Sequence, residues 1–421
     1  MPLFSRTLGL AEPKAFLTKA LQSQKFPHAL LIHGLEGVGQ NALLLDLADI
    51  LLCEKVMEEL EIAPCGQCKS CLGRIHENLD NITFLIPLEK KGKADSKMES
   101  KADSDGGMED DLVDELANRI KEFRQDVYGF LPSPKSRINI AQTRALQAHL
   151  SFSEVNNRPR IIIIPFIETM PHEAANALLK TLEEPPANTY FLISSQDRAG
   201  LLPTILSRCT KLPIPPMTSI ELTQALAEKG KDFGLENLSP RLIPFAEGSL
   251  GALISLNRNG GEALLNEAGA FFHAAFSQSN SQSHSQNKAR GQDQSNIQGK
   301  DSAQSVSTDW RRFSDYLEGS DFFVDMDSTS RLIPLLLRMV RLCHRMKVYD
   351  QKKIDESLNA EDEKTLSALI QPLFLIDDLQ ALVQWLEEIL SAVQSYAKPR
   401  IAVLGLYLDY EAKNFLQKAN A

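Results

Sequence analysis

The sequence predicts an α/β protein whose main domain is a doubly wound parallel sheet. Three short apolar runs rich in branched residues are typical of buried parallel strands. These runs lie at residues 29–34, 161–164 and 188–195. Helical apolar spacing at residues 13–24 and 41–53 places helices beside the first run. Because strands alternate with helices over residues 1–212, we expect one doubly wound domain there.

The remaining chain is divided by two segments of unusual composition. At 421 residues the chain is long enough for two or three domains. We predict helical domains at residues 213–276 and 310–421. Residues 89–111 mix charges of both signs without apolar periodicity, which indicates a disordered insertion in the first domain. Ser and Gln make up sixteen of the thirty-two residues 277–308, so we predict a linker over 277–309.

The last helical domain carries a stripe of apolar side chains at helical spacing. The stripe consists of Leu375, Leu379, Leu382, Leu386 and Ile389. Such a stripe is typical of a helix packed inside a bundle, and it also fits a surface that joins subunits. Spacing alone leaves both interpretations open.

Composition and charge exclude some classes of function. The formal net charge of −10 argues against binding DNA by wholesale neutralisation of phosphates, so any contact with DNA would depend on protein partners. The N-terminus has no basic stretch followed by an apolar run, and no apolar run reaches about 18 residues. We therefore expect a cytoplasmic protein with no membrane partner.

A glycine-rich turn follows the first predicted strand. Gly34, Gly37 and Gly39 have the spacing of a phosphate-binding loop, whose backbone N–H groups cradle phosphates. Gln40 stands where the loop lysine would neutralise phosphate, and Asn41 stands where a hydroxyl would bind Mg²⁺. Both electrostatic parts of catalysis are missing, and Gln40 is expected to be idle and outside the core. A glycine nest alone leaves only weak anion affinity, so ATP is not an expected ligand.

The strand at residues 161–164 gives an independent indication of the same loss. ATPases of this kind have an Asp-Glu pair directly after that strand, but Pro165 and Phe166 follow it here. Neither residue can bind Mg²⁺ or accept a proton. Glu168 lies two residues further on and is expected to be a solvated loop charge. We therefore predict that the chain is not an enzyme.

Four cysteines lie within nineteen residues of one another. They are Cys53, Cys65, Cys68 and Cys71. Their spacing is typical of a metal site rather than of a disulfide framework. Four thiolates make a closed tetrahedral Zn²⁺ site, which would staple the segment and leave no open position for catalysis. An iron–sulfur site is disfavoured because no fourth cysteine followed by proline extends the CxxCxxC run.

Arg208 lies in the run Ser207-Arg208-Cys209, after a predicted short helix at the edge of the sheet domain. An arginine in such a position is most often only a solvated charge. In a protein without a working site of its own, it could instead reach a neighbouring subunit in trans and stabilise a transferring phosphate as an arginine finger.

These segments together resemble the bacterial clamp-loader family of AAA+ proteins. The resemblance rests on "FPHALLIHGLEGVGQ", the four-cysteine module, "EAANALLKTLEEPPANTYFLISS" and "LLPTILSRC". It covers about residues 10–86 and 137–260, with a weaker match around "KPRIAVLGLYL". The cysteine module has a longer first gap than the family pattern, and the two insertions make this chain long.

The resemblance implies an architecture and a role. The sheet domain would be an AAA+ domain, residues 213–276 a helical lid and residues 310–421 a helical collar that joins subunits. ATPase subunits of the family keep the loop lysine and the Asp-Glu pair, and they tend to have a nucleotide-sensing arginine where Gly251 stands here. Subunits without these groups donate the arginine of the Ser-Arg-Cys motif, here Arg208. Implied partners are the gamma/tau and delta subunits, the sliding clamp and primed DNA.

Three functions stay open at this point. The favoured one is a non-catalytic clamp-loader subunit. The first alternative is an ATPase subunit with an unusual active site, which Gln40 and the Pro165-Phe166 pair argue against. The second is a zinc-stapled scaffold in another DNA process, which only a list of partners would separate.

Overall fold

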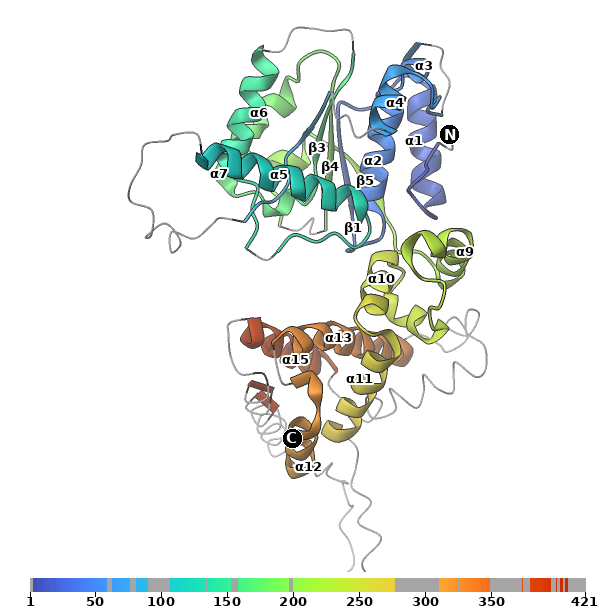
Figure 1. Cartoon of the computed structure of the whole chain (residues 1–421), viewed down its shortest axis with the longest axis vertical. Coiled ribbons are helices and arrows are strands. Elements are labelled where there is room, and N and C mark those ends of the chain that lie inside the picture. The colour runs from blue at the N-terminus through green and yellow to red at the C-terminus, as the bar shows by residue number, and fades with distance from the viewer. Residues whose placement is uncertain are drawn as a thin grey trace, which may run out of the picture. The chain divides into compact units, whose positions relative to one another are not determined.

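The computed structural model separates the chain into two compact units (Figure 1). The first unit contains residues 1–236 and 247–255, and the second contains residues 237–246 and 256–421. The structure describes residues 3–58, 63–75, 81–89, 107–133, 135–152, 158–196, 200–276, 310–323, 326–348 and 379–394, with 373, 399, 402–403 and 406–407. The predicted linker at residues 277–309 and residues 90–106 of the predicted insertion lie outside these ranges.

The first unit is built on a parallel sheet, as predicted, and this sheet has five strands. The strands are β1 (Ala29–Gly34), β2 (Ile82–Phe84), β3 (Arg160–Ile164), β4 (Thr189–Ser195) and β5 (Thr210–Ile214). Their order across the sheet is β2-β3-β4-β1-β5, and all pairs are parallel. From β1 the chain crosses to β2 at one edge of the sheet, returns through β3 and β4, and ends in β5 at the other edge. Because the chain crosses the sheet in both directions, the sheet is doubly wound.

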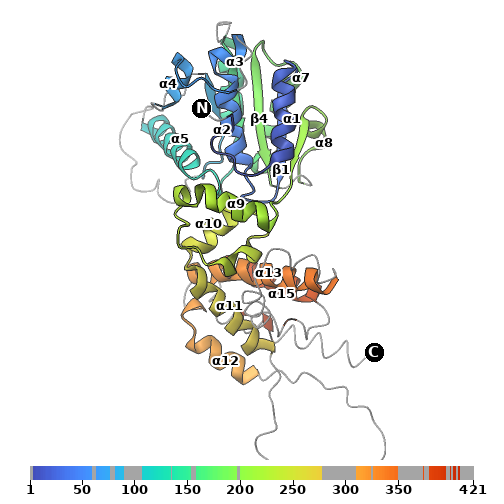
Figure 2. The same cartoon turned by 90° about the vertical axis from the view of Figure 1, so that its right-hand side faces the viewer.

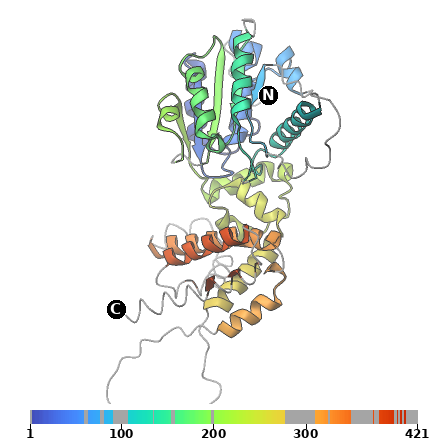
Figure 3. The same ribbon diagram turned by 90° about the vertical axis from the view of Figure 1, so that its left-hand side faces the viewer.

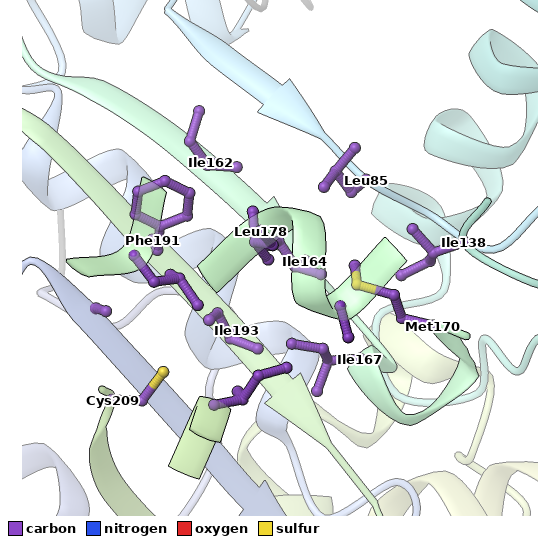
Figure 4. Close-up of a cluster of buried hydrophobic side chains, with 14 of the residues drawn as sticks. Leu85, Ile138, Ile162, Ile164, Ile167, Met170, Leu178, Phe191, Ile193 and Cys209 are labelled. Carbon is purple, nitrogen blue, oxygen red and sulfur yellow. The ribbon is translucent and has the colours of Figure 1, made fainter. Parts of the chain in front are cut away.

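Both faces of the central strands are buried, which explains their continuous apolar runs. Leu31 lies opposite Ile193, and Ile162 opposite Phe191, in register across β1, β4 and β3. These side chains form one core cluster with residues of the helices on that face (Figure 4). Their neighbours along the strands, such as Leu30, are equally buried. These neighbours lie on the opposite face, because successive side chains of a strand point to opposite faces of the sheet.

Helices cover both faces of the sheet. On one face lie α1 (Ala11–Gln22) and α2 (Gln40–Leu51), with α1 beside β5 and α2 beside the central strands (Figure 2). On the other lie α6 (Ile140–Phe152) and α7 (His172–Glu183), side by side (Figure 3). The unit also contains α3 (Glu54–Glu58), α4 (Lys69–Ile75), α8 (Pro203–Leu206), α9 (Ser219–Lys229), and 3-10 turns at Ile167–Thr169 and Gly230–Phe233.

A long helix, α5 (Gly107–Gln125), lies at the β2 edge of the sheet (Figure 1). Residues 107–111 of the predicted insertion form its start. The helix is fastened by Phe123, whose ring lies 6.0 Å from that of Phe84 in β2 and 5.5 Å from that of Phe130. Edge-to-face aromatic pairs of this kind are favourable.

The second unit is helical. It contains a 3-10 turn (Pro240–Ala246), α11 (Gly261–Phe276), α12 (Trp310–Gly319), a 3-10 turn (Asp321–Phe323), α13 (Met326–Val348) and α15 (Leu379–Gln394), while α10 (Leu250–Arg258) begins in the first unit. Phe271 is central to its core, with ring centroids 5.4 Å from Phe313 and 6.0 Å from Trp385. Among the helices that the structure describes, none combines the length and apolar character needed to cross a membrane.

The apolar stripe of the last domain lies mostly on α15. Leu379, Leu382, Leu386 and Ile389 are all buried within the second unit, and α15 packs against α13. Leu375 lies outside the described residues. The stripe therefore forms an intramolecular bundle contact, the first of the two interpretations that spacing left open.

Candidate functional site

The glycine-rich turn connects the carboxyl end of β1 to the start of α2. The structure brings together Gly34, Gly37, Gly39, Gln40 and Asn41, as the sequence predicted. Gly37 and Gly39 have φ angles of 70° and 116°, a region that favours glycine because it has no Cβ. The turn therefore joins a parallel strand to the start of a helix through two glycines with positive φ.

Gln40 is committed to the loop itself. Its Nε2 donates to the carbonyl oxygens of Gly34, at 2.8 Å, and of Leu35, at 2.7 Å. The residue is only 4% exposed. The expectation that Gln40 lies outside the core is therefore wrong. The reason is that its amide fits carbonyl groups that lie within its reach along the turn, a pairing that residue type alone does not reveal.

Asn41 connects the loop to a neighbouring strand. Its Oδ1 accepts a hydrogen bond from the Ser194 hydroxyl of β4 at 3.1 Å, and both residues are buried. The side chain that occupies the position of a Mg²⁺-binding hydroxyl is therefore satisfied inside the protein. Ser194 was not singled out from the sequence, because its partner lies 153 residues away.

The start of α10 packs directly on the tip of the loop. The Ser249 hydroxyl donates to the Glu36 carbonyl at 2.7 Å, and the N–H of Gly251 donates to the Gly37 carbonyl at 3.0 Å. A Cβ built on Gly251 would lie 2.2 Å from the Tyr128 carbonyl oxygen and 2.7 Å from the Cα of Gly37. Only glycine permits this close approach. The packing of the loop therefore explains why a glycine, and no arginine, occupies position 251.

Just after the carboxyl end of β3, the side chain of Phe166 packs among aromatic residues. Phe166 is 2% exposed, has a left-handed φ of 56°, and its ring lies 5.8 Å from that of Phe130. Glu168 accepts a hydrogen bond from the N–H of Gln196 at 3.0 Å. Glu168 is therefore tied to the end of β4 rather than being the solvated charge that we expected.

The four cysteines converge on one point. The sulfur atoms of Cys53, Cys65, Cys68 and Cys71 all lie within 4.8 Å of one another, and those of Cys65 and Cys71 are 3.9 Å apart. Sulfur ligands at about 2.3 Å from a tetrahedral Zn²⁺ lie about 3.8 Å apart, so the cluster is close to the required size. The protein therefore places four soft ligands where a metal could bind.

Backbone N–H groups point at these sulfurs. The N–H groups of Gln67 and Cys68 donate to Sγ of Cys65 at 3.4 and 3.3 Å, and that of Cys71 donates to Sγ of Cys68 at 3.4 Å. The bond from Gln67, followed by that from Cys68, lowers the pKa of the Cys65 thiol to about 6. Donors of this kind favour the thiolate, which is the form that binds metal.

Arg208 follows α8, at the beginning of the edge strand β5. Its side chain is 28% exposed. Nε donates to Oε1 of Glu183 at 2.7 Å, and Nη1 donates to the Thr204 carbonyl at 2.8 Å. The structure thus places Arg208 apart from the chain's own loop and paired with the last residue of α7. Glu183 was not singled out from the sequence, which has no signal for a pair 25 residues apart.

A glycine-rich loop between a central parallel strand and a helix, in a sheet of order β2-β3-β4-β1-β5, defines an AAA+ domain. Residues 10–218 also match the family model described as DNA polymerase III, delta subunit. Over these residues the chain belongs to the clamp-loader family, and it is a delta prime-like member. The family had been predicted from the sequence motifs.

Individual relatives agree with this family. The delta prime subunit of DNA polymerase III from Yersinia pestis is 31% identical over 182 residues, which cover 43% of this chain and 40% of that protein. The tau/gamma subunit from Haemophilus influenzae is 24% identical over 250 residues, which cover 59% of this chain and 29% of that protein. The chain thus spans two fifths or less of the length of these relatives.

A solved structure shows a more distant likeness. The gamma subunit-related protein of DNA polymerase III from Thermotoga maritima aligns with 95% of this chain, and the alignment covers 98% of that protein. The identity is 14% and the TM-score 0.38.

Proposed function

We propose that the chain is a non-catalytic subunit of the bacterial replicative clamp loader. In this role it joins the gamma/tau and delta subunits, helps to load the sliding clamp on primed DNA, and donates Arg208 to the ATP site of a neighbouring subunit. The observation that carries the proposal is the contrast between the glycine-rich loop and Arg208. The side chains of Gln40 and Asn41 in the chain's own loop are bonded within the protein, while Arg208 is partly exposed at the edge of the sheet domain.

The hydrogen bonds of the loop side chains within the protein support the absence of ATP turnover by this chain. Catalysis at such a site needs a cation on the phosphate oxygens and ligands for Mg²⁺. Here Gln40 bonds the loop carbonyls, Asn41 bonds Ser194, and Phe166 packs in the aromatic cluster that follows β3. None of these groups can supply either requirement, so the chain would act through a partner's site.

The likeness to tau/gamma subunits keeps an alternative in view, namely an ATPase subunit with an unusual active site. That function would need a loop free to receive phosphate. The hydrogen bonds of Gln40 and Asn41 within the protein disfavour it, because they engage the two side chains that stand where phosphate and Mg²⁺ would need a lysine and a hydroxyl.

We further propose that the cysteine cluster binds one structural Zn²⁺. The residues fit the ion in number, in chemistry and in the size of the cluster. Cys53, Cys65, Cys68 and Cys71 would hold it. The metal would fix the segment between α2 and α4 and would take no part in ATP turnover, because four thiolates leave no open position.

Replacement of Arg208 tests the proposed function. In a loader reconstituted with its ATPase subunits, Arg208→Ala should leave assembly intact and slow the turnover stimulated by clamp and DNA. Loss of a true finger costs about 10³-fold or more at the affected site, and the total falls less because other sites continue. Arg144→Ala is the matched control, since Arg144 is an exposed arginine on α6 of the same unit. Equal turnover for the two variants would refute the finger role.

A further inference from the structure

The guanidinium group of Arg208 already has partners within its own chain. Both Nε and Nη2 donate to the same carboxylate oxygen, Oε1 of Glu183. On the other side Nη1 donates to the Thr204 carbonyl at 2.8 Å and to the Ser207 hydroxyl at 3.3 Å. The edge formed by Nε and Nη2, one of the two that can grip an anion with paired N–H groups, is therefore occupied.

Glu183 is held in an electrostatically unfavourable place. It is the last residue of α7, and the C-terminal end of a helix carries a partial negative charge that disfavours a carboxylate. The exposed side chain of Glu184 adds a second negative charge beside it. Arg208 forms an ion pair with Glu183 at this acidic end, and Lys180 lies in the last turn of the same helix.

The pair is nevertheless exchangeable. The side chain of Glu183 is 46% exposed and that of Arg208 is 28% exposed, so water and salt screen their attraction. A phosphate group offers more charge and more acceptor oxygens than one carboxylate, and it can take the same edge of the guanidinium. Binding of Arg208 to phosphate and to Glu183 through this edge would be mutually exclusive.

We propose that Glu183 is a positioning residue that holds Arg208 against its own subunit until phosphate of a neighbouring ATP displaces it. This inference rests on the proposed finger role of Arg208. Glu183 thereby raises the barrier to ATP turnover in the loader before clamp and DNA are bound. The retained bond from Nη1 to Thr204 keeps the arginine near its working position after Glu183 releases it.

The test is Glu183→Gln in the reconstituted loader, with ATP turnover measured without and with clamp and primed DNA. The variant keeps the shape of the side chain and removes its charge. Because exposed ion pairs are weak, we expect turnover without clamp and DNA to rise about two- to five-fold. Glu184→Gln is the matched control, which makes the same change of charge one residue away and should leave turnover unchanged.

A double variant shows whether the effect passes through Arg208. In the Arg208→Ala background, Glu183→Gln should give no rise, because the group that Glu183 holds is missing. Raising the salt concentration should also narrow the difference between the wild type and Glu183→Gln. A purely structural role for Glu183 would produce neither result.

The outcomes separate this inference from the proposed function. If Arg208→Ala slows turnover while Glu183→Gln leaves it unchanged or lowers it, the holding role of Glu183 is wrong and the finger role stands. If Glu184→Gln raises turnover as much as Glu183→Gln, general charge rather than direct contact is responsible, and the inference is again wrong. If Arg208→Ala has no effect, the finger role fails and this inference fails with it.

Discussion

Gln40 takes the place of a phosphate-binding lysine and uses its amide to tie the loop to itself. Two carbonyl groups, of Gly34 and Leu35, receive its N–H groups at 2.8 and 2.7 Å. A lysine at this position would present a charge to the space that phosphate occupies in a working loop. The side chain of Gln40 instead makes two hydrogen bonds within the loop.

Replacement of Gln40 by alanine should make the protein less stable. The change leaves two loop carbonyls without their donors and should lower the free energy of unfolding by about 1–2 kcal/mol. Denaturant unfolding of the full chain measures the shift. Gln22→Ala is the control, since Gln22 is exposed at the end of α1 and should show almost no shift. An identical midpoint for the two variants would mean that the Gln40 bonds contribute nothing to stability.

Among the structural elements, the cysteine segment would depend most on the proposed metal. The described part of this segment runs from the end of α2 into α4 and consists of short helices and turns. Backbone N–H groups already point at the sulfurs of Cys65 and Cys68. A segment of this kind gains stability chiefly from metal, because metal-binding free energy becomes folding free energy.

Cys68→Ser tests the segment. The wild-type protein should contain about one Zn²⁺ per chain, and the variant should lose both the metal and part of its thermal stability. Metal analysis of freshly prepared, reduced protein gives the content, and thermal unfolding gives the stability. Cys209→Ser is the control, because Cys209 is a buried cysteine outside the cluster and its variant should keep the metal. A wild-type protein free of zinc would end the zinc proposal.

At the level of the whole molecule, the two units contribute different parts of the proposed function. The described part of the first unit contains a glycine-rich loop whose side chains are bonded within the protein and a partly exposed arginine, and the second unit contributes a helical bundle. The proposed function requires assembly with other subunits, and ATP turnover by the isolated chain would contradict it.

The isolated chain should therefore hydrolyse no ATP. Even Gln40→Lys with Asn41→Thr should stay inactive, because Phe166 still follows β3 and Ser249 and Gly251 still hold the loop. Phosphate release at saturating ATP and Mg²⁺ measures the rate, with Gly39→Pro as the background control, since its altered loop could not serve as a site. Turnover in the wild type that disappears in Gly39→Pro would reveal a working active site.

Sequence by itself determined the sheet, the loop and the cysteine cluster of this protein. Each is encoded locally: apolar runs of the right length, glycines at positions with positive φ, and thiols a few residues apart. It also indicated the family, because several such local motifs occur in one order. The strands β2 and β5 were missed because β2 has only three residues and because three of the five residues of β5, an edge strand, are exposed, so neither strand forms a long buried apolar run.

Tertiary structure alone decided what the loop and the arginine touch. The contacts of Asn41 with Ser194, of Glu36 with Ser249 and of Glu183 with Arg208 join residues 153, 213 and 25 positions apart. Hydrogen bonds across such separations depend on how strands and helices pack, and residue types and spacing do not encode that geometry. For this reason Glu168 was assigned to solvent from sequence, although the fold gives it a partner 28 residues away.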